Sequence, residues 1–147
     1  MENKNLSPQK FVPWFMWSMF CIAIFVYGLV IWLSRNSTLH EGVLVPTSVK
    51  NSFYVVSFIF AFVSLFVIDN VFKRKINNQK QNGELTESQI LTMYFPFFLI
   101  KLAVSESIAI FGMTLAFMGE EKLSIFLPFA ILSFLLLLIN RPKEINN

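Results

Sequence analysis

Four long apolar segments make up most of this chain, and short polar segments separate them. They cover about residues 14–33, 53–72, 91–118 and 123–139. A run of about 20 apolar residues can cross the hydrocarbon layer of a bilayer as one α-helix, and a run of about 17 is at the lower limit. We therefore predict an all-α, polytopic membrane protein with four transmembrane helices in a single domain, residues 1–147.

Composition argues against several other classes of protein. Only 14% of the 147 residues are charged, whereas soluble domains carry about 25%. The single cysteine, Cys21, excludes a disulfide framework and a cysteine-based metal site. We expect no metal and no other cofactor. The net charge of +3 follows from membrane topology, so nucleic acid is not an expected partner and the lipid bilayer is.

Basic residues predict the orientation of the helices. Four crossings place both termini and the polar segment 73–89 on the same side of the membrane. That side holds eight basic residues, Lys4, Lys10, Lys73, Arg74, Lys75, Lys80, Arg141 and Lys143, and the other side holds three, Arg35, Lys50 and Lys122. Short cytoplasmic links are enriched in Lys and Arg, so both termini are predicted to be cytoplasmic. The compact spans and short links favour a bacterial inner membrane.

The cytoplasmic segment 73–89 has its own signals. It opens with Lys73, Arg74 and Lys75, a triplet that stops translocation and that also suits anionic lipid headgroups. Asp69 precedes Lys73 by four residues, the spacing of an ion pair within one helix. We expect a turn at Asn82-Gly83. Thr86 with Gln89 three residues later has the spacing of a capping box at the start of the third span.

The third apolar segment contains two ionisable side chains, Lys101 and Glu106. They lie roughly 12–15 Å and roughly 20–23 Å along the predicted span. Lys101 can extend its ammonium group towards the cytoplasmic headgroups. The shorter Glu106 lies near the middle of the bilayer, where a charged residue costs about 2.5–3.5 kcal/mol. Glu106 must therefore be protonated, paired or in contact with water.

A partner for Glu106 has to come from another helix. Five residues of an α-helix turn by about 140° beyond a full circle, so Lys101 and Glu106 lie on different faces. Two partners remain open, a hydroxyl bonded to the neutral acid and Lys101 of a neighbouring copy of the chain. The polar residues near the middle of the other spans are Ser18, Tyr27, Ser57, Ser64 and Ser133.

The third span also carries small residues along one face. These five residues, called here the small-residue stripe, are Ser105, Ala109, Gly112, Ala116 and Gly119. Small residues allow another helix backbone to approach closely within a membrane. Lys101 falls on the stripe and Glu106 beside it. The stripe is therefore a predicted helix-packing surface, and Glu106 with Lys101 is a hypothetical ion-binding pair.

The segment Ser105–Phe117, SESIAIFGMTLAF, resembles the carboxylate-bearing helix of the proteolipid (c-type) subunits of rotary ATPases. That helix carries a carboxylate near the middle of the membrane, followed by small and aliphatic residues. The resemblance implies an ion-carrying role for Glu106. It is local, because the second span contains no glycine and the cytoplasmic segment lacks the Arg-Gln-Pro turn of that family. It identifies no family for the whole chain.

Two functional hypotheses follow from the sequence. The first is a small multipass protein that packs, through the third span, with itself or with a larger membrane complex. The alternative is a protein that handles protons or sodium with Glu106. The sequence contains no H-E-x-x-H, G-x-S-x-G or phosphate-loop motif, so we predict no catalytic residues and no enzymatic activity.

Overall fold

The computed structural model describes residues 8–34, 45–81, 86–119 and 122–142 of the chain. Nearly all of these residues are helical and none of them forms a strand, which confirms the all-α class. In chain order the elements are α1 (Pro8–Leu33), α2 (Thr47–Phe62), the π-helical turn η2 (Val63–Val67), α3 (Ile68–Lys80), α4 (Glu87–Met118) and α5 (Lys122–Ile139). The elements α2, η2 and α3 follow one another without a break and form one long rod.

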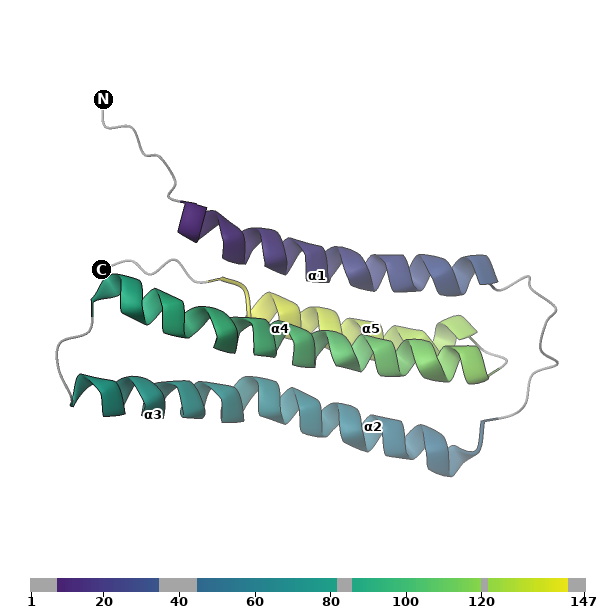
Figure 1. Ribbon diagram of the computed structural model, residues 1–147. Helices are drawn as coiled ribbons and strands as arrows, with labels where there is room; N and C mark the ends of the chain where they lie inside the picture. Colours follow the sequence, from purple (N-terminus) through teal and green to yellow (C-terminus); the bar gives the residue numbers. More distant parts are fainter. Residues whose placement is uncertain (1–7, 35–44, 82–85, 120–121, 143–147) are drawn as a thin grey trace.

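The helices form an up-and-down bundle with α4 at its centre. Figure 1 shows α1 and the α2–α3 rod on opposite sides of α4, with α5 behind it. The helix α4 packs against α1, α2, α3 and α5, and α5 also packs against α1. The start of α1, the end of α3, the start of α4 and the end of α5 lie at one end of the bundle, as an alternating path across a membrane requires (Figure 1).

The helices have the length and surface of membrane-spanning segments. Phe11–Leu33, Thr47–Lys80 and Gln89–Met118 are each long and apolar enough to cross a bilayer, and the apolar helix Leu123–Ile139 is shorter. The 18 residues of α5 extend over about 27 Å, slightly less than the hydrocarbon thickness of about 30 Å. Large apolar side chains such as Phe25 (67% exposed) and Phe58 (66%) cover the outside of the bundle. Such a surface is typical of a helical bundle that lies in a membrane.

The α2–α3 rod, which corresponds to the second predicted span, is longer than the sequence predicted. It begins at Thr47 rather than near residue 53 and continues to Lys80 rather than residue 72. Residues 73–80, predicted to be part of a loop, are therefore helical. The apolar run marks only the part of a helix that lies in lipid, whereas Lys, Arg and Gln continue a helix in water with little cost.

The ends of two other helices can also be compared with the sequence. The first helix starts at Pro8 rather than near residue 14, and Pro13 lies inside it. The capping box before α4 is confirmed, because the Thr86 N–H donates to Oε1 of Gln89 over 3.1 Å. The turn predicted at Asn82-Gly83 lies outside the described residues.

Candidate functional site: polar groups inside the bundle

Glu106 on α4 accepts a hydrogen bond from the hydroxyl of Tyr27 on α1. The distance from Tyr27 Oη to Glu106 Oε1 is 2.5 Å, and both residues are partly buried. Of the two partners that the sequence left open, a hydroxyl and a lysine from another copy, this chain supplies the hydroxyl itself. The bond satisfies one oxygen of a carboxyl group that would otherwise face apolar surroundings.

Lys101 pairs with Asp69 across the boundary between α4 and α3. Lys101 Nζ lies 2.5 Å from Asp69 Oδ1, and the side chains are 16% and 47% exposed, respectively. The sequence suggested Lys73 as the partner of Asp69, and this assignment is wrong. Lys101 was expected either to extend to the headgroups or to meet Glu106 of another copy, and instead finds a carboxylate on the neighbouring helix. A charge in a transmembrane span is typically paired in this way.

A third polar contact ties three helices together. Ser64 and Ser105 place their Oγ atoms 3.3 Å apart, and Asn140 Nδ2 donates to Ser64 Oγ over 2.9 Å. The Ser133 hydroxyl on α5 donates to the Ser105 carbonyl over 2.6 Å. All four residues are buried. Sequence reasoning missed Asn140, because it follows the last apolar run and was assigned to the polar tail.

The π-helical turn η2 makes two of these contacts compatible. On α4, Lys101 and Ser105 are four residues apart and share a face, whereas their partners Asp69 and Ser64 are five residues apart. In a regular α-helix, five residues would place Asp69 about 140° away from Ser64. A π-helical turn takes up one extra residue, which reduces this angle to about 40°. The turn therefore brings Asp69 onto the side that faces Lys101.

The end of α5 is held by α1. The indole Nε1 of Trp17 donates to the backbone carbonyl of Leu137 over 2.7 Å. Leu137 lies in the last turn of α5, where carbonyl groups lack partners within the helix. The carbonyl group of Leu137 near the end of α5 is thus satisfied by a side chain of α1.

The small-residue stripe of α4 is covered by α5 of the same chain. Ser105, Ala109 and Ala116 are fully buried, and Gly112 and Gly119 are buried as well. A Cβ atom at Gly112 would lie 2.5 Å from Cβ of Phe129 on α5, so only glycine fits there. The stripe packs helices, as its composition predicted, but its partner belongs to this chain.

A second stripe on α4 is left open by the rest of the chain. These six residues, called here the open stripe, are Ile100, Ala103, Ser107, Ile110, Thr114 and Phe117. Five of them are exposed and Ser107 is partly so. The hydroxyls of Ser107 and Thr114 donate to carbonyls one turn earlier on α4, those of Ala103 and Ile110, over 2.8 and 2.9 Å.

The predicted headgroup residues lie on α3, beyond its apolar part. Lys73, Arg74 and Lys75 are all exposed. The Nζ atom of Lys75 lies 5.5 Å from the centre of the Phe97 ring, within the range of a cation–π contact.

The described residues show no arrangement suited to a metal ion. No group of three or more His, Cys, Asp or Glu side chains lies close enough together among them. Cys21 is buried in the apolar cluster.

Comparisons with models of known protein families, with curated proteins and with solved structures gave no match. The contacts of the chain itself therefore carry the functional argument.

Proposed function

We propose that this protein is a small multipass membrane protein that assembles through α4 with a further transmembrane helix, from a second copy of the chain or from a larger membrane complex. The observation that carries this proposal is the open stripe. Its members Ala103, Ser107 and Thr114 are small or hydroxylic and are left uncovered by α1, α2 and α5. Interfaces between transmembrane helices are enriched in such residues.

The spacing of the open stripe fits a helical partner. Its six residues are separated by 3, 4, 3, 4 and 3 positions. This is the repeat of about 3.5 residues that keeps two helices in contact along their length. At about 100° per residue, the open stripe lies on the side of α4 opposite the small-residue stripe. Figure 1 agrees, because α5 lies behind α4 and no helix covers its front.

The polar contacts of the bundle support a structural role for its charged residues. Glu106 is bonded to Tyr27, and Lys101 is paired with Asp69, both within the chain. No buried side-chain nitrogen or oxygen among the described residues lacks a hydrogen-bond partner. These contacts fix α1 and the α2–α3 rod on the two sides of α4 and so define the open stripe between them.

The assembly proposal is tested by filling the open stripe. Ser107→Trp should block close approach of a partner helix. The purified variant should therefore no longer form a complex with a second copy of the chain or with a co-purifying protein. The measurement is the mass of the complex in mild detergent by light scattering. Ile22→Trp is the matched control, because Ile22 is 54% exposed on α1, away from the stripe. A wild-type protein that is monomeric and alone, or a Ser107→Trp variant that assembles normally, would contradict the proposal.

A second candidate is the transfer of protons or sodium by Glu106. Two observations favour it, the partial exposure of Glu106 near the middle of α4 and the resemblance of Ser105–Phe117 to an ion-carrying helix. In reconstituted vesicles, Glu106→Gln would then abolish proton- or sodium-dependent flux while the protein still accumulates. Carbodiimide would react with Glu106, and sodium or high pH would block the reaction. If assembly is the function, Glu106→Gln leaves the mass of the complex unchanged.

The bacterial inner membrane is the proposed location. The uneven distribution of basic residues and the short links between spans support it.

A further inference from the structure

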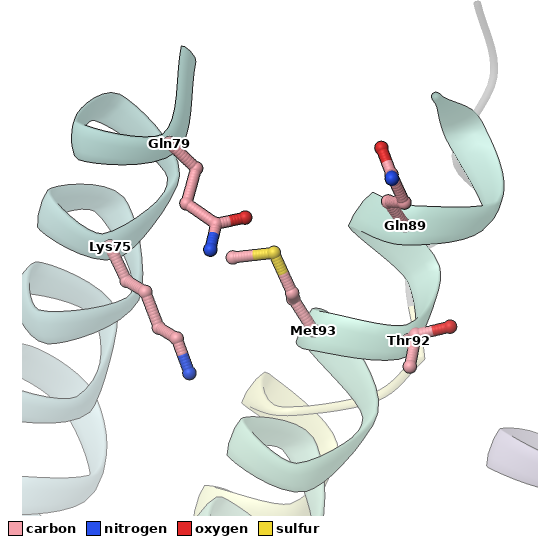
Figure 2. A pocket seen from close by; sticks show the side chains of 5 residues that line it. All are labelled: Lys75, Gln79, Gln89, Thr92 and Met93. Carbon is pink, nitrogen blue, oxygen red and sulfur yellow. The ribbon is translucent and has the colours of Figure 1, made fainter. Parts of the chain in front are cut away.

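An open cleft lies between the end of α3 and the start of α4. Figure 2 shows its five lining residues, Lys75 and Gln79 on α3 and Gln89, Thr92 and Met93 on α4. Its volume is about 320 Å³. Among the described residues that line the cleft there is one cation and no acid, and three of the other four carry an amide or a hydroxyl group.

The polar groups of the cleft suit an anionic oxygen ligand. Lys75 offers an ammonium group, and Gln79 extends its amide from α3 towards α4 (Figure 2). Gln89 uses its amide oxygen to accept the N–H of Thr86 in the capping box, which leaves its NH₂ group as a donor. Both helices thus contribute donors to the cleft, although the Lys75 ammonium and the Gln89 amide lie towards opposite ends of it (Figure 2). Phosphate oxygens accept bonds from such donors.

Along the helix axis, the cleft lies at about the level of the headgroup layer of the membrane. Phe72 marks the end of the apolar part of the rod, and its ring lies 5.8 Å from that of Tyr94 and 5.3 Å from that of Phe97. Tyrosine is enriched at the membrane–water interface, so Tyr94 supports this position of the boundary. Lys75 and Gln79 follow Phe72 by about 5 and 10 Å along the helix. A headgroup layer is about 5–8 Å thick, so Lys75 lies within it and Gln79 just beyond it, on the side of the water.

We propose that this cleft binds the phosphate of an anionic phospholipid from the cytoplasmic leaflet, held by Lys75 and the amides of Gln79 and Gln89. The acyl chains would lie against the exposed apolar surface below. This site is distinct from the open stripe, which lies farther along α4. It also differs from a general attraction of lipid to the triplet 73–75, because it assigns Lys75 a place in a defined cleft.

The test measures lipid binding to the full chain in mild detergent by native mass spectrometry. The protein is titrated with phosphatidylglycerol and, separately, with phosphatidylcholine. The wild type should bind the first phosphatidylglycerol at least about five-fold more tightly, the effect of one lysine near a membrane surface. Lys75→Gln should abolish this preference, and Gln79→Leu should weaken it. Lys80→Gln, which removes the same charge five residues farther along α3, should leave it unchanged.

Three results would overturn the proposal. The first is a wild-type protein without a preference for the anionic lipid. The second is an equal loss in Lys75→Gln and Lys80→Gln, which would indicate a diffuse basic surface. The third is displacement of phosphatidylglycerol by millimolar glycerol 3-phosphate or inorganic phosphate, which would make a soluble phosphate compound the occupant. Unchanged thermal unfolding of Lys75→Gln confirms that the variant is folded.

Discussion

The bond between Tyr27 and Glu106 shows how a carboxyl group is accommodated within a span. A short side chain near the middle of a bilayer cannot reach water, so a hydroxyl on a neighbouring helix takes that role. The sequence predicted that Glu106 needs a partner from another helix, and Tyr27 was among the candidates. It could not choose between them, because the choice depends on how α1 is rotated against α4.

Removing the hydroxyl of Tyr27 should destabilise the bundle. Tyr27→Phe leaves Glu106 without this donor, whereas Glu106→Gln keeps an acceptor oxygen and should have a smaller effect. A double-mutant cycle of Tyr27→Phe with Glu106→Met, each of which removes the bond, should give a coupling free energy of about 0.6 kcal/mol and at most about 1.7 kcal/mol, the average and the maximum found between transmembrane helices. The measurement is unfolding in detergent. Tyr54→Phe is the control, since the ring of Tyr54 stacks on Phe129 and is kept. A coupling near zero would show that the bond contributes nothing.

The ion pair of Lys101 and Asp69 should contribute more to the free energy of unfolding than any pair of Asp69 and Lys73. Lys101→Met leaves the carboxylate of Asp69 without its partner. We expect a loss of about 1–2 kcal/mol, less than for a fully buried pair, because Asp69 is 47% exposed. Asp69→Asn combined with Lys101→Gln should restore part of the stability. Unfolding in detergent measures each variant. An equal loss in Lys73→Met would instead support the local pair that the sequence suggested.

At the scale of elements, the apolar runs predicted where helices cross the membrane but not where they end. Residues 73–80 continue a helix although all of them except Ile76 are polar. Neither composition nor spacing predicts the π-helical turn η2, because its five residues, VSLFV, are an ordinary apolar run. This turn determines which side of the rod faces α4. The error over Asp69 has the same origin, since spacing within a helix was the only evidence the sequence offered.

Deleting Phe66 should turn η2 into a regular α-helix without changing the side on which Asp69 lies, because Ser64 and Asp69 would then be four residues apart and still about 40° from each other. Adding an alanine after Phe66 should instead rotate α3 by about 100° and turn Asp69 away from Lys101. In a Cys21→Ser background, Asp69→Cys and Lys101→Cys should be joined by a short bifunctional maleimide in the parent protein. The yield should be kept after the deletion and fall sharply after the insertion. A yield lost without Phe66, or kept after the insertion, would show that η2 does not set the register.

The contact between α4 and α5 makes a sharp prediction at Gly112. Gly112→Ala places a methyl group 2.5 Å from Cβ of Phe129, which is close to the backbone and cannot move aside. The helices would have to separate, at a cost of about 1–3 kcal/mol in the free energy of unfolding. Gly28→Ala is the matched control, because its methyl group would meet Phe126 at an ordinary 3.5 Å. Equal stability of the two variants in detergent would contradict the close packing.

At the scale of the whole molecule, the alternation of apolar and polar segments predicted most of the architecture. Four helices in an up-and-down order follow from burial of apolar residues in lipid and from links too short for other paths. The small-residue stripe predicted close helix packing, but not that α5 of the same chain would fill it. A stripe of small residues indicates that another helix backbone approaches closely. The residues in the stripe are the same whether that second helix belongs to the same chain or to another one, so the sequence cannot identify it.

Orientation in the membrane is open to a direct measurement. In a Cys21→Ser background, Lys50→Cys should react with a membrane-impermeant maleimide on intact cells, because the distribution of basic residues places it outside. Lys80→Cys and Arg141→Cys should react only after permeabilisation. Arg141 follows α5, whose length of about 27 Å is near the minimum for a crossing. Reaction of Arg141→Cys on intact cells, with Lys80→Cys still protected, would mean that α5 does not cross. Reaction of Lys80→Cys alone would reverse the predicted orientation of the α2–α3 rod.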